Sequence, residues 1–159
     1  MAYRKLSSQN LSLTYLIAIH ILRLPIELIL YQLYLKELIP ELMTYQGWNF
    51  DILTGISAVM ILVLYALNKL RREVFLVWNW LGLGLLVIIV VLAVLSAPTP
   101  LQQFAFEQPN VAVLKFPFIW LPAVVVPIVL LSHLLMIRHL KATLNVVKNG
   151  ELPSSKSVR

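Results

Sequence analysis

Four long apolar stretches constrain this chain more than any other feature of its sequence. They run over residues 11–35, 51–68, 74–97 and 118–137. About 20 apolar residues in a helix cross the hydrocarbon core of a bilayer, where the helix pairs its own backbone polar groups. With 60% hydrophobic and 13% charged residues, the chain has too much apolar surface for a soluble globule of its size. The sequence therefore predicts an all-α integral membrane protein, a four-helix bundle with a single transmembrane domain over residues 1–148.

Cysteine content, charge and the motif search exclude several classes of protein. The chain has no cysteine, so it has no disulfide, no cysteine nucleophile and no thiolate metal site. The net charge is +6, but so apolar a chain is not a nucleic-acid-binding protein. There is no phosphate-binding, dinucleotide-binding or zinc-protease motif. We therefore predict no cofactor and no metal, and the sequence leaves open whether the protein is an enzyme.

Lysine and arginine fall mainly on one side of the predicted spans. With the N-terminus inside, two of them are outside (Lys36 and Lys115), one is within a span (Arg23), and ten are inside: Arg4, Lys5, Lys69, Arg71, Arg72, Arg138, Lys141, Lys148, Lys156 and Arg159. Cytoplasmic loops carry such an excess of positive charge. The pattern predicts a multi-pass protein of the cell membrane, in contact with membrane lipids, with both termini cytoplasmic. The polar, basic tail over residues 149–159 is predicted to be disordered.

The two outer connections are long and amphiphilic, and they are predicted to contain short amphipathic helices. Thr99, Pro100 and Gln102 form a helix-start pattern, in which threonine caps the helix and glutamine completes a capping box. Pro109 would end such a helix, so we expect one over residues 100–107. Asp51 is expected to cap the second apolar stretch.

A row of polar side chains interrupts the first apolar stretch. At about 100° per residue, five of them share an arc of about 80° on one side of the helix: His20, Arg23, Glu27, Tyr31 and Tyr34. Charged groups facing lipid cost several kcal/mol, so this stripe must face other helices or a wet cavity. We expect Arg23 and Glu27, one turn apart, to neutralise each other. Prolines in the first and fourth stretches predict bent helices around a central space.

Aromatic and histidine side chains of the fourth stretch extend the candidate site. His133 is placed at the depth of His20, and Trp120 at the depth of Glu27. The predicted ligand-binding residues are therefore His20, Arg23, Glu27, Tyr31, Tyr34, Trp120 and His133. Charged residues within a span are a functional hypothesis by default, although a structural ion pair explains the same pattern.

Three functions fit these residues. The first is a protein that binds or transports a small amphiphilic or charged molecule in an intramembrane polar cavity, with transport requiring a homodimer. The second is a structural or accessory subunit whose stripe meets a helix of a partner membrane subunit. The third is a membrane-embedded enzyme on a lipid-like substrate, with His20 and Glu27 handling protons. The first predicts a pocket that reaches Arg23 and Glu27.

Overall fold

Four helices make up the fold over residues 13–148, the part of the chain that the computed structural model describes, with side chains as far as residue 140. No β-strand occurs in this range. The first helix is continuous and consists of α1 (Leu13–Ile19), the 3-10 turn η2 (His20–Leu22) and α2 (Arg23–Leu35). Next come α3 (Asp51–Ala66) and α4 (Arg72–Leu95), and the fourth helix combines a π-helical turn, η5 (Leu121–Val125), with α5 (Val126–Lys148). The predicted tail over 149–159 lies outside the described residues.

The four predicted apolar stretches are all helical, but they differ in length. Three helices are long and apolar enough to cross a membrane: Leu13–Leu35, Arg72–Leu95 and Leu121–Leu140. The second, α3, has only 16 residues, about 24 Å at 1.5 Å per residue, against the roughly 30 Å of a hydrocarbon core. It ends earlier than predicted because Asn68 adopts a left-handed conformation (φ 55°) and Lys69 N–H closes the turn on the Leu64 carbonyl.

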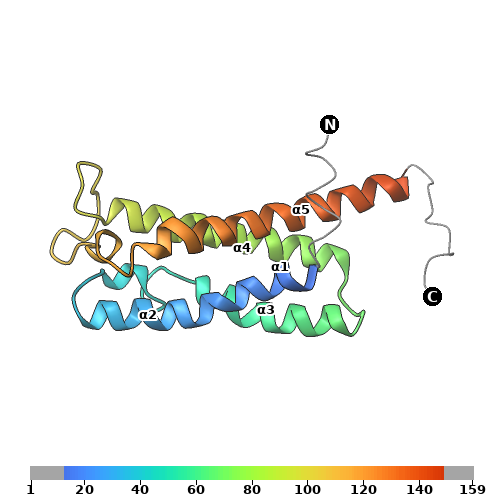
Figure 1. Ribbon diagram of the computed structural model, residues 1–159, viewed down its shortest axis with the longest axis horizontal. Helices are drawn as coiled ribbons and strands as arrows, with labels where there is room; N and C mark the ends of the chain where they lie inside the picture. The colour runs from blue at the N-terminus through green and yellow to red at the C-terminus, as the bar shows by residue number, and fades with distance from the viewer. Residues whose placement is uncertain (1–12, 149–159) are drawn as a thin grey trace.

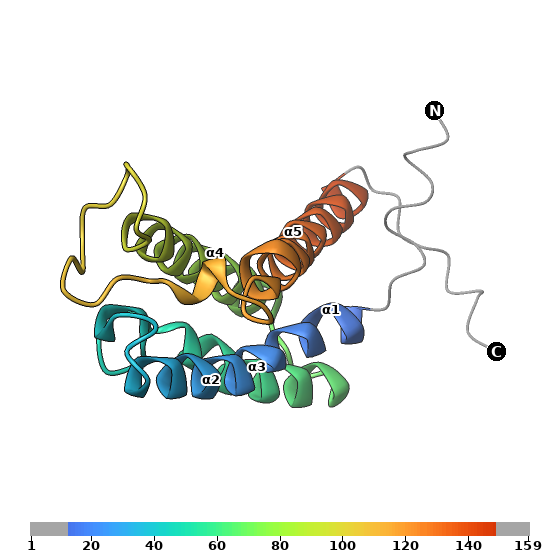
Figure 2. The same cartoon turned by 60° about the vertical axis from the view of Figure 1, so that its left-hand side comes forward.

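The helices form two layers, with the first helix and α3 in one and α4 and α5 in the other (Figure 1). The α1 segment packs against both α3 and α5, and α4 packs along α5. Near the start of α3, Gly55 lies against Leu24, so α3 runs beside α1 and the first turns of α2 only. The rest of α2 lies beside the α2–α3 connection, which contains the 3-10 helix η3 (Glu41–Met43). Figure 2 shows the separation between α2 and the α4–α5 layer.

The first and fourth helices depart from α-helical geometry close to their prolines. In the first helix, the tight turn η2 comes directly before the turn that holds Pro25, which has no N–H to donate. In the fourth helix, the π-helical turn η5 contains Pro122 and directly precedes the turn of Pro127. The local irregularities thus occur where the prolines remove backbone hydrogen bonds, as the sequence predicts.

The expected helix over residues 100–107 does not form. Thr99 Oγ1 does accept a hydrogen bond from Leu101 N–H at 3.3 Å, but the Gln102 amide turns forward to the carbonyls of Phe104 and Ala105 instead of back to Thr99. Ala105 has a positive φ of 56°, which a continuing α-helix excludes. The prediction was wrong because these local bonds replace the capping box. The short helices of the two long connections are η3 and the 3-10 helix η4 (Ala112–Leu114).

The helices bury two apolar clusters with a polar layer between them. One, the Phe75 cluster, consists of Leu16, Ile17, Ile61, Phe75, Met136 and Leu140. The other, the Leu92 cluster, consists of Leu30, Leu33, Ile39, Met43, Leu92 and Ala112. The buried side chains that lie between the two clusters along the helices form the polar layer: His20, Arg23, Glu27, Asn49, Asp51, Thr54, Asn79, Ser132 and His133. This layer contains most of the candidate functional residues.

Candidate functional site

The first three residues of the predicted stripe are buried by the chain's own helices. His20 is 0%, Arg23 2% and Glu27 1% exposed. Lipid therefore does not contact these side chains, as the expected cost of an exposed charge requires. These three side chains are covered without a helix of another subunit.

Arg23 pairs with Asp51, and this finding corrects two predictions. The guanidinium Nη1 donates to Asp51 Oδ1 in a buried ion pair between the first helix and the start of α3. It is the only ion pair with a carboxylate that the described residues show for Arg23, so the expected Arg23–Glu27 pair does not form. Because Asp51 lies within the polar layer, it is a closer counterion for Arg23 than the expected partner one turn away.

Asn49 takes the capping role that we assigned to Asp51. Its Oδ1 accepts the Asp51 N–H at 3.1 Å, while the side chain of Asp51 makes no cap hydrogen bond at the start of α3. This local turn leaves the Asp51 carboxylate free to meet Arg23. The Asn49 amide also donates to Glu27 Oε1 at 2.6 Å and to the Met43 carbonyl at 3.0 Å. Asn49 therefore holds both acids of the layer in place.

Glu27 is bound on one side only. Its Oε1 accepts from Asn49, but its Oε2 is buried and has no hydrogen-bond partner among the side chains that the structure describes. Leaving a buried carboxylate oxygen unsatisfied is expensive, and natural structures rarely do so without a reason. An occupant of the adjoining space could supply the missing donor.

The hydrogen bonds around His133 define its tautomer. The Asn79 amide nitrogen donates to the His133 carbonyl at 3.0 Å, which turns Asn79 Oδ1 toward His133 Nδ1. Nδ1 therefore carries the proton. Arg23 Nη2, which can only donate, lies 2.9 Å from His133 Nε2, so Nε2 accepts. His133 is thus a neutral acceptor that steadies Arg23.

His20 is fixed by Ser132 in a similar way. The Ser132 hydroxyl donates to the Val129 carbonyl at 2.7 Å, so its oxygen accepts from His20 Nε2 at 2.9 Å. His20 Nδ1 then has no proton, and no described residue bonds to it. The two imidazole rings lie side by side, with centroids 4.2 Å apart. The structure brings together the two histidines that the sequence placed at one depth.

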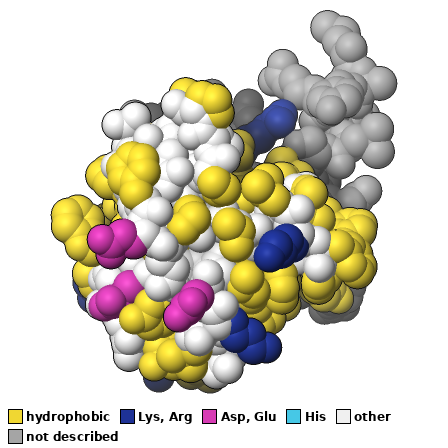
Figure 3. Space-filling model, turned by 90° about the vertical axis from the view of Figure 1, so that its left-hand side faces the viewer, with side chains coloured by type: hydrophobic (Ala, Val, Ile, Leu, Met, Phe, Trp, Pro, Cys, Tyr) yellow, Lys and Arg dark blue, Asp and Glu magenta, His cyan; other side chains and the backbone are white. Residues whose placement is uncertain are grey.

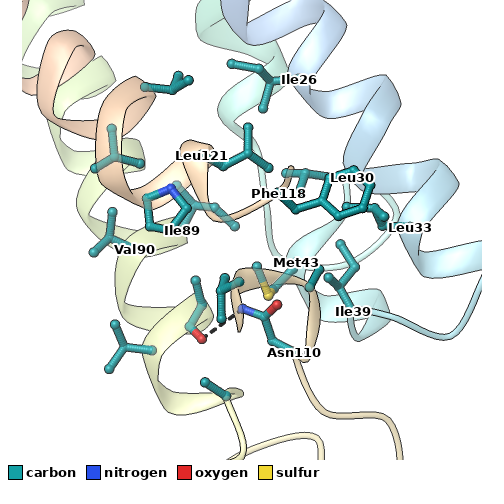
Figure 4. Close-up of a pocket in the computed structure, with 18 of the residues that line it drawn as sticks. Ile26, Leu30, Leu33, Ile39, Met43, Ile89, Val90, Asn110, Phe118 and Leu121 are labelled. Atoms are coloured by element: carbon teal, nitrogen blue, oxygen red, sulfur yellow. Dashed lines mark hydrogen bonds between the residues drawn. The ribbon is translucent and has the colours of Figure 1, made fainter. Parts of the chain in front are cut away.

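A cavity of about 610 Å³ adjoins the polar layer between α2 and the α4–α5 layer. Figure 4 shows Ile26, Leu30 and Leu33 of α2 on one side and Ile89 and Val90 of α4 on another. Arg23, Glu27 and Asp51 also line this cavity. The remaining wall is almost wholly apolar. The cavity reaches Arg23 and Glu27, as the binding hypothesis requires, but it is an apolar cavity with one charged end and not the polar cavity that we expected.

The two long connections line the end of the cavity that lies away from the polar layer. The N–H groups of Val111 and Ala112 both donate to the Leu38 carbonyl, at 3.0 and 3.1 Å, and Gln108 Nε2 donates to the Ile39 carbonyl at 2.6 Å. In the same segment, Asn110 Nδ2 donates a hydrogen bond to the Ala93 carbonyl of α4 (Figure 4). In the fourth helix, Pro122 lines the cavity and is also exposed. The cavity thus has an opening on a helix side.

Five of the seven predicted site residues do not line the cavity. Tyr31 and Tyr34 are half-buried next to the α2–α3 connection, where Tyr31 packs on Tyr45 with ring centroids 5.0 Å apart. The Tyr34 hydroxyl donates to Glu41 at 3.4 Å. Trp120 is 55% exposed and does not line the cavity. His20 and His133 support the layer but do not line the cavity either.

The sequence interpretation missed Asn49, Asp51 and Asn79 as members of this site. One signal was present for the first two. An asparagine two residues before an aspartate at the start of an apolar helix can cap the helix itself, which frees the acid for another partner. For Asn79, only its neighbours in space reveal the role, because His133 is 54 residues away in sequence.

Comparison with known proteins places the chain in a family. Residues 2–141 match the family described as a domain of unknown function, DUF8737, and the chain belongs to it. The comparison with curated proteins found no match, and the comparison with solved structures found none either. The function must therefore be argued from the site itself.

Proposed function

We propose that this protein is a multi-pass membrane protein that binds a small amphiphilic molecule in the cavity between α2 and the α4–α5 layer. The observation that carries the proposal is the combination of an apolar wall with one charged end. Ligand pockets of about 300–1,000 Å³ have mostly apolar walls and a few polar groups that orient the ligand. The cavity has about 610 Å³ and meets Arg23, Glu27 and Asp51 at one end.

The proposed orientation of the ligand follows from these walls. Its apolar body lies between Leu30 on α2 and Val90 on α4, and its polar group reaches the buried oxygen of Glu27. A membrane lipid or a lipid-like molecule enters beside Pro122, from the side of the helices. The Phe75 cluster fills the space beyond His20, which favours binding over passage through the protein.

The proposed topology is a four-helix bundle with both termini in the cytoplasm. The end that carries the two long connections shows acidic and basic side chains among hydrophobic ones (Figure 3), as expected at a membrane surface. The exposed basic residues Lys69, Arg71 and Arg138 lie toward the opposite end of the helices. In this topology α3 falls short of the outer surface of the membrane, and the α2–α3 connection completes the outer part beside α2.

The geometry supports the enzyme alternative less well. That hypothesis used His20 and Glu27 together as proton-handling groups. Glu27 lines the cavity, but His20 does not, and its Nε2 is already bonded to Ser132. An occupant of the cavity would thus meet one of the two groups.

Analysis of the lipids that copurify with the protein tests the proposal. The protein is purified in mild detergent, and bound small molecules are extracted and measured by mass spectrometry. Val90→Phe fills the cavity, whereas Val91→Phe adds the same ring on the lipid-facing side of α4, where Val91 is 46% exposed. We expect a copurified amphiphile with wild type and Val91→Phe but not with Val90→Phe. Equal amounts in all three proteins would contradict the proposal.

A further inference from the structure

With Glu27 ionised, the charges of the polar layer do not balance without an occupant. Arg23 is positive and is paired with Asp51. His133 accepts the Arg23 hydrogen bond at its Nε2, and His20 donates through Nε2 while its Nδ1 has no partner, so neither ring carries a positive charge. Glu27 is then the excess acid, with its closest polar contact, Asn49, a neutral amide. A buried charge without a counterion is strongly unfavourable.

The unpaired oxygen of Glu27 adds a second requirement. Oε2 is buried, lies in a residue that is 1% exposed, and has no hydrogen-bond donor within the described part of the chain. Because Glu27 lines the cavity, a ligand can reach this oxygen. The group that satisfies both requirements is a positively charged N–H donor.

Arg23 does not offer an equivalent site for an anion. Its two terminal nitrogens already contact Asp51, the Gly82 carbonyl and His133. An anionic group beside the remaining Nε would also lie next to two carboxylates, Glu27 and Asp51. An acidic amphiphile is therefore repelled where a basic one is attracted.

We infer that the ligand of this cavity is a cationic amphiphile, a long-chain primary or secondary amine whose N–H donates to Glu27 Oε2. This inference rests on the proposed function and specifies its ligand class. The alkyl chain lies along the apolar wall formed by Leu30, Ile89 and Val90, and the ammonium group completes the polar layer. The complex then has one cation for each of its two acids.

Competition photolabelling in phosphatidylcholine nanodiscs tests this inference. The probe is dodecanol with a photoreactive diazirine in its chain, and the competitors are dodecylamine, dodecyltrimethylammonium, dodecanol and dodecanoate. A charged hydrogen bond contributes about 1.5–3 kcal/mol, so dodecylamine should compete roughly tenfold or more better than dodecanol. Dodecyltrimethylammonium, which has no N–H, should compete less well than dodecylamine, and dodecanoate worst of all.

Three variants assign the result to the site. Glu27→Gln should make dodecylamine and dodecanol equal competitors, whereas Glu107→Gln, which changes an exposed acid on the α4–α5 connection, should leave the wild-type order unchanged. Val90→Phe should abolish labelling of the cavity residues.

The outcomes separate the two claims. If wild type is labelled but all four competitors act equally, or dodecanoate competes best, the amine inference is wrong and the cavity proposal stands. If the trimethylammonium competes as well as dodecylamine, the N–H bond to Glu27 is wrong. If the cavity residues of wild type are not labelled at all, the proposed function itself fails.

Discussion

At the residue scale, the partner of Arg23 determines the chemistry of the whole layer. Both Glu27 and Asp51 are buried acids within its reach, but only Asp51 forms the ion pair. The sequence placed Arg23 and Glu27 on one face of a helix and could not show that Asp51 descends to the same depth. That information lies in the packing of α3, which starts beside Leu24.

This assignment predicts different effects on stability for two isosteric substitutions. Asp51→Asn removes the counterion of Arg23, so it should lower the free energy of unfolding by about 3–5 kcal/mol. Glu27→Gln removes an acid without a counterion and keeps an acceptor for Asn49, so ligand-free protein should stay within about 1 kcal/mol of wild type or gain stability. Unfolding in mixed micelles with increasing dodecyl sulfate measures both. Equal losses in the two variants would mean that Arg23 depends on both acids alike.

A second residue-scale prediction concerns Asn79, which fixes the tautomer of His133. Asn79→Asp keeps the size of the side chain but replaces the amide donor to the His133 carbonyl with an acceptor. The loss of a buried hydrogen bond should cost about 1–3 kcal/mol. The carboxylate still accepts from Nδ1–H, and Arg23 still donates to Nε2, so the nitrogen chemical shifts of His133 should stay those of the Nδ1–H tautomer. Shifts of the Nε2–H tautomer would contradict the assignment.

At the element scale, the helices pack closely where α4 passes His133. A Cβ on Gly82 would lie 2.8 Å from His133 Cε1 and 3.0 Å from Thr54 Cγ2, whereas a Cβ on Gly84 meets nothing within 4 Å. Gly82→Ala should therefore cost about 1–3 kcal/mol through overpacking. Gly84→Ala should be neutral or slightly stabilising, because alanine favours a helix over glycine. The same unfolding assay compares the two variants. Equal effects would mean that Gly82 is not in close contact with His133 and Thr54.

The sequence predicted the helical elements well and their connections poorly. The length of the apolar stretches alone located all four helices, because a helix that crosses a bilayer needs a long apolar stretch. The connections depend on single side-chain bonds, such as that of Gln102 to Phe104, which a capping pattern does not reveal. In the site, the stripe on the first helix was identified from its periodicity. The roles of Asn49 and Asp51 were missed because they depend on contacts between distant segments.

At the scale of the whole molecule, the proposed topology makes a prediction that the cysteine-free sequence is well suited to test. Glu73, in the first turn of α4, and Gln103, in the α4–α5 connection, are both exposed, so each is replaced by a single cysteine in a separate variant. With the N-terminus inside, a membrane-impermeant maleimide should label Gln103→Cys in intact cells and Glu73→Cys only after permeabilisation. The reverse pattern would mean that the topology is inverted. Labelling of both variants in intact cells would mean that α4 does not cross the membrane.

The central claim is that the cavity holds an amphiphile whose polar end reaches Glu27. An experimental structure of the protein purified with its native lipids tests it most directly. We predict continuous density between α2 and α4, along Leu30 and Val90, with a polar atom within hydrogen-bonding distance of Glu27 Oε2. A cavity closed by direct packing of α2 on α4, with Glu27 bonded to another side chain of the protein, would contradict the account.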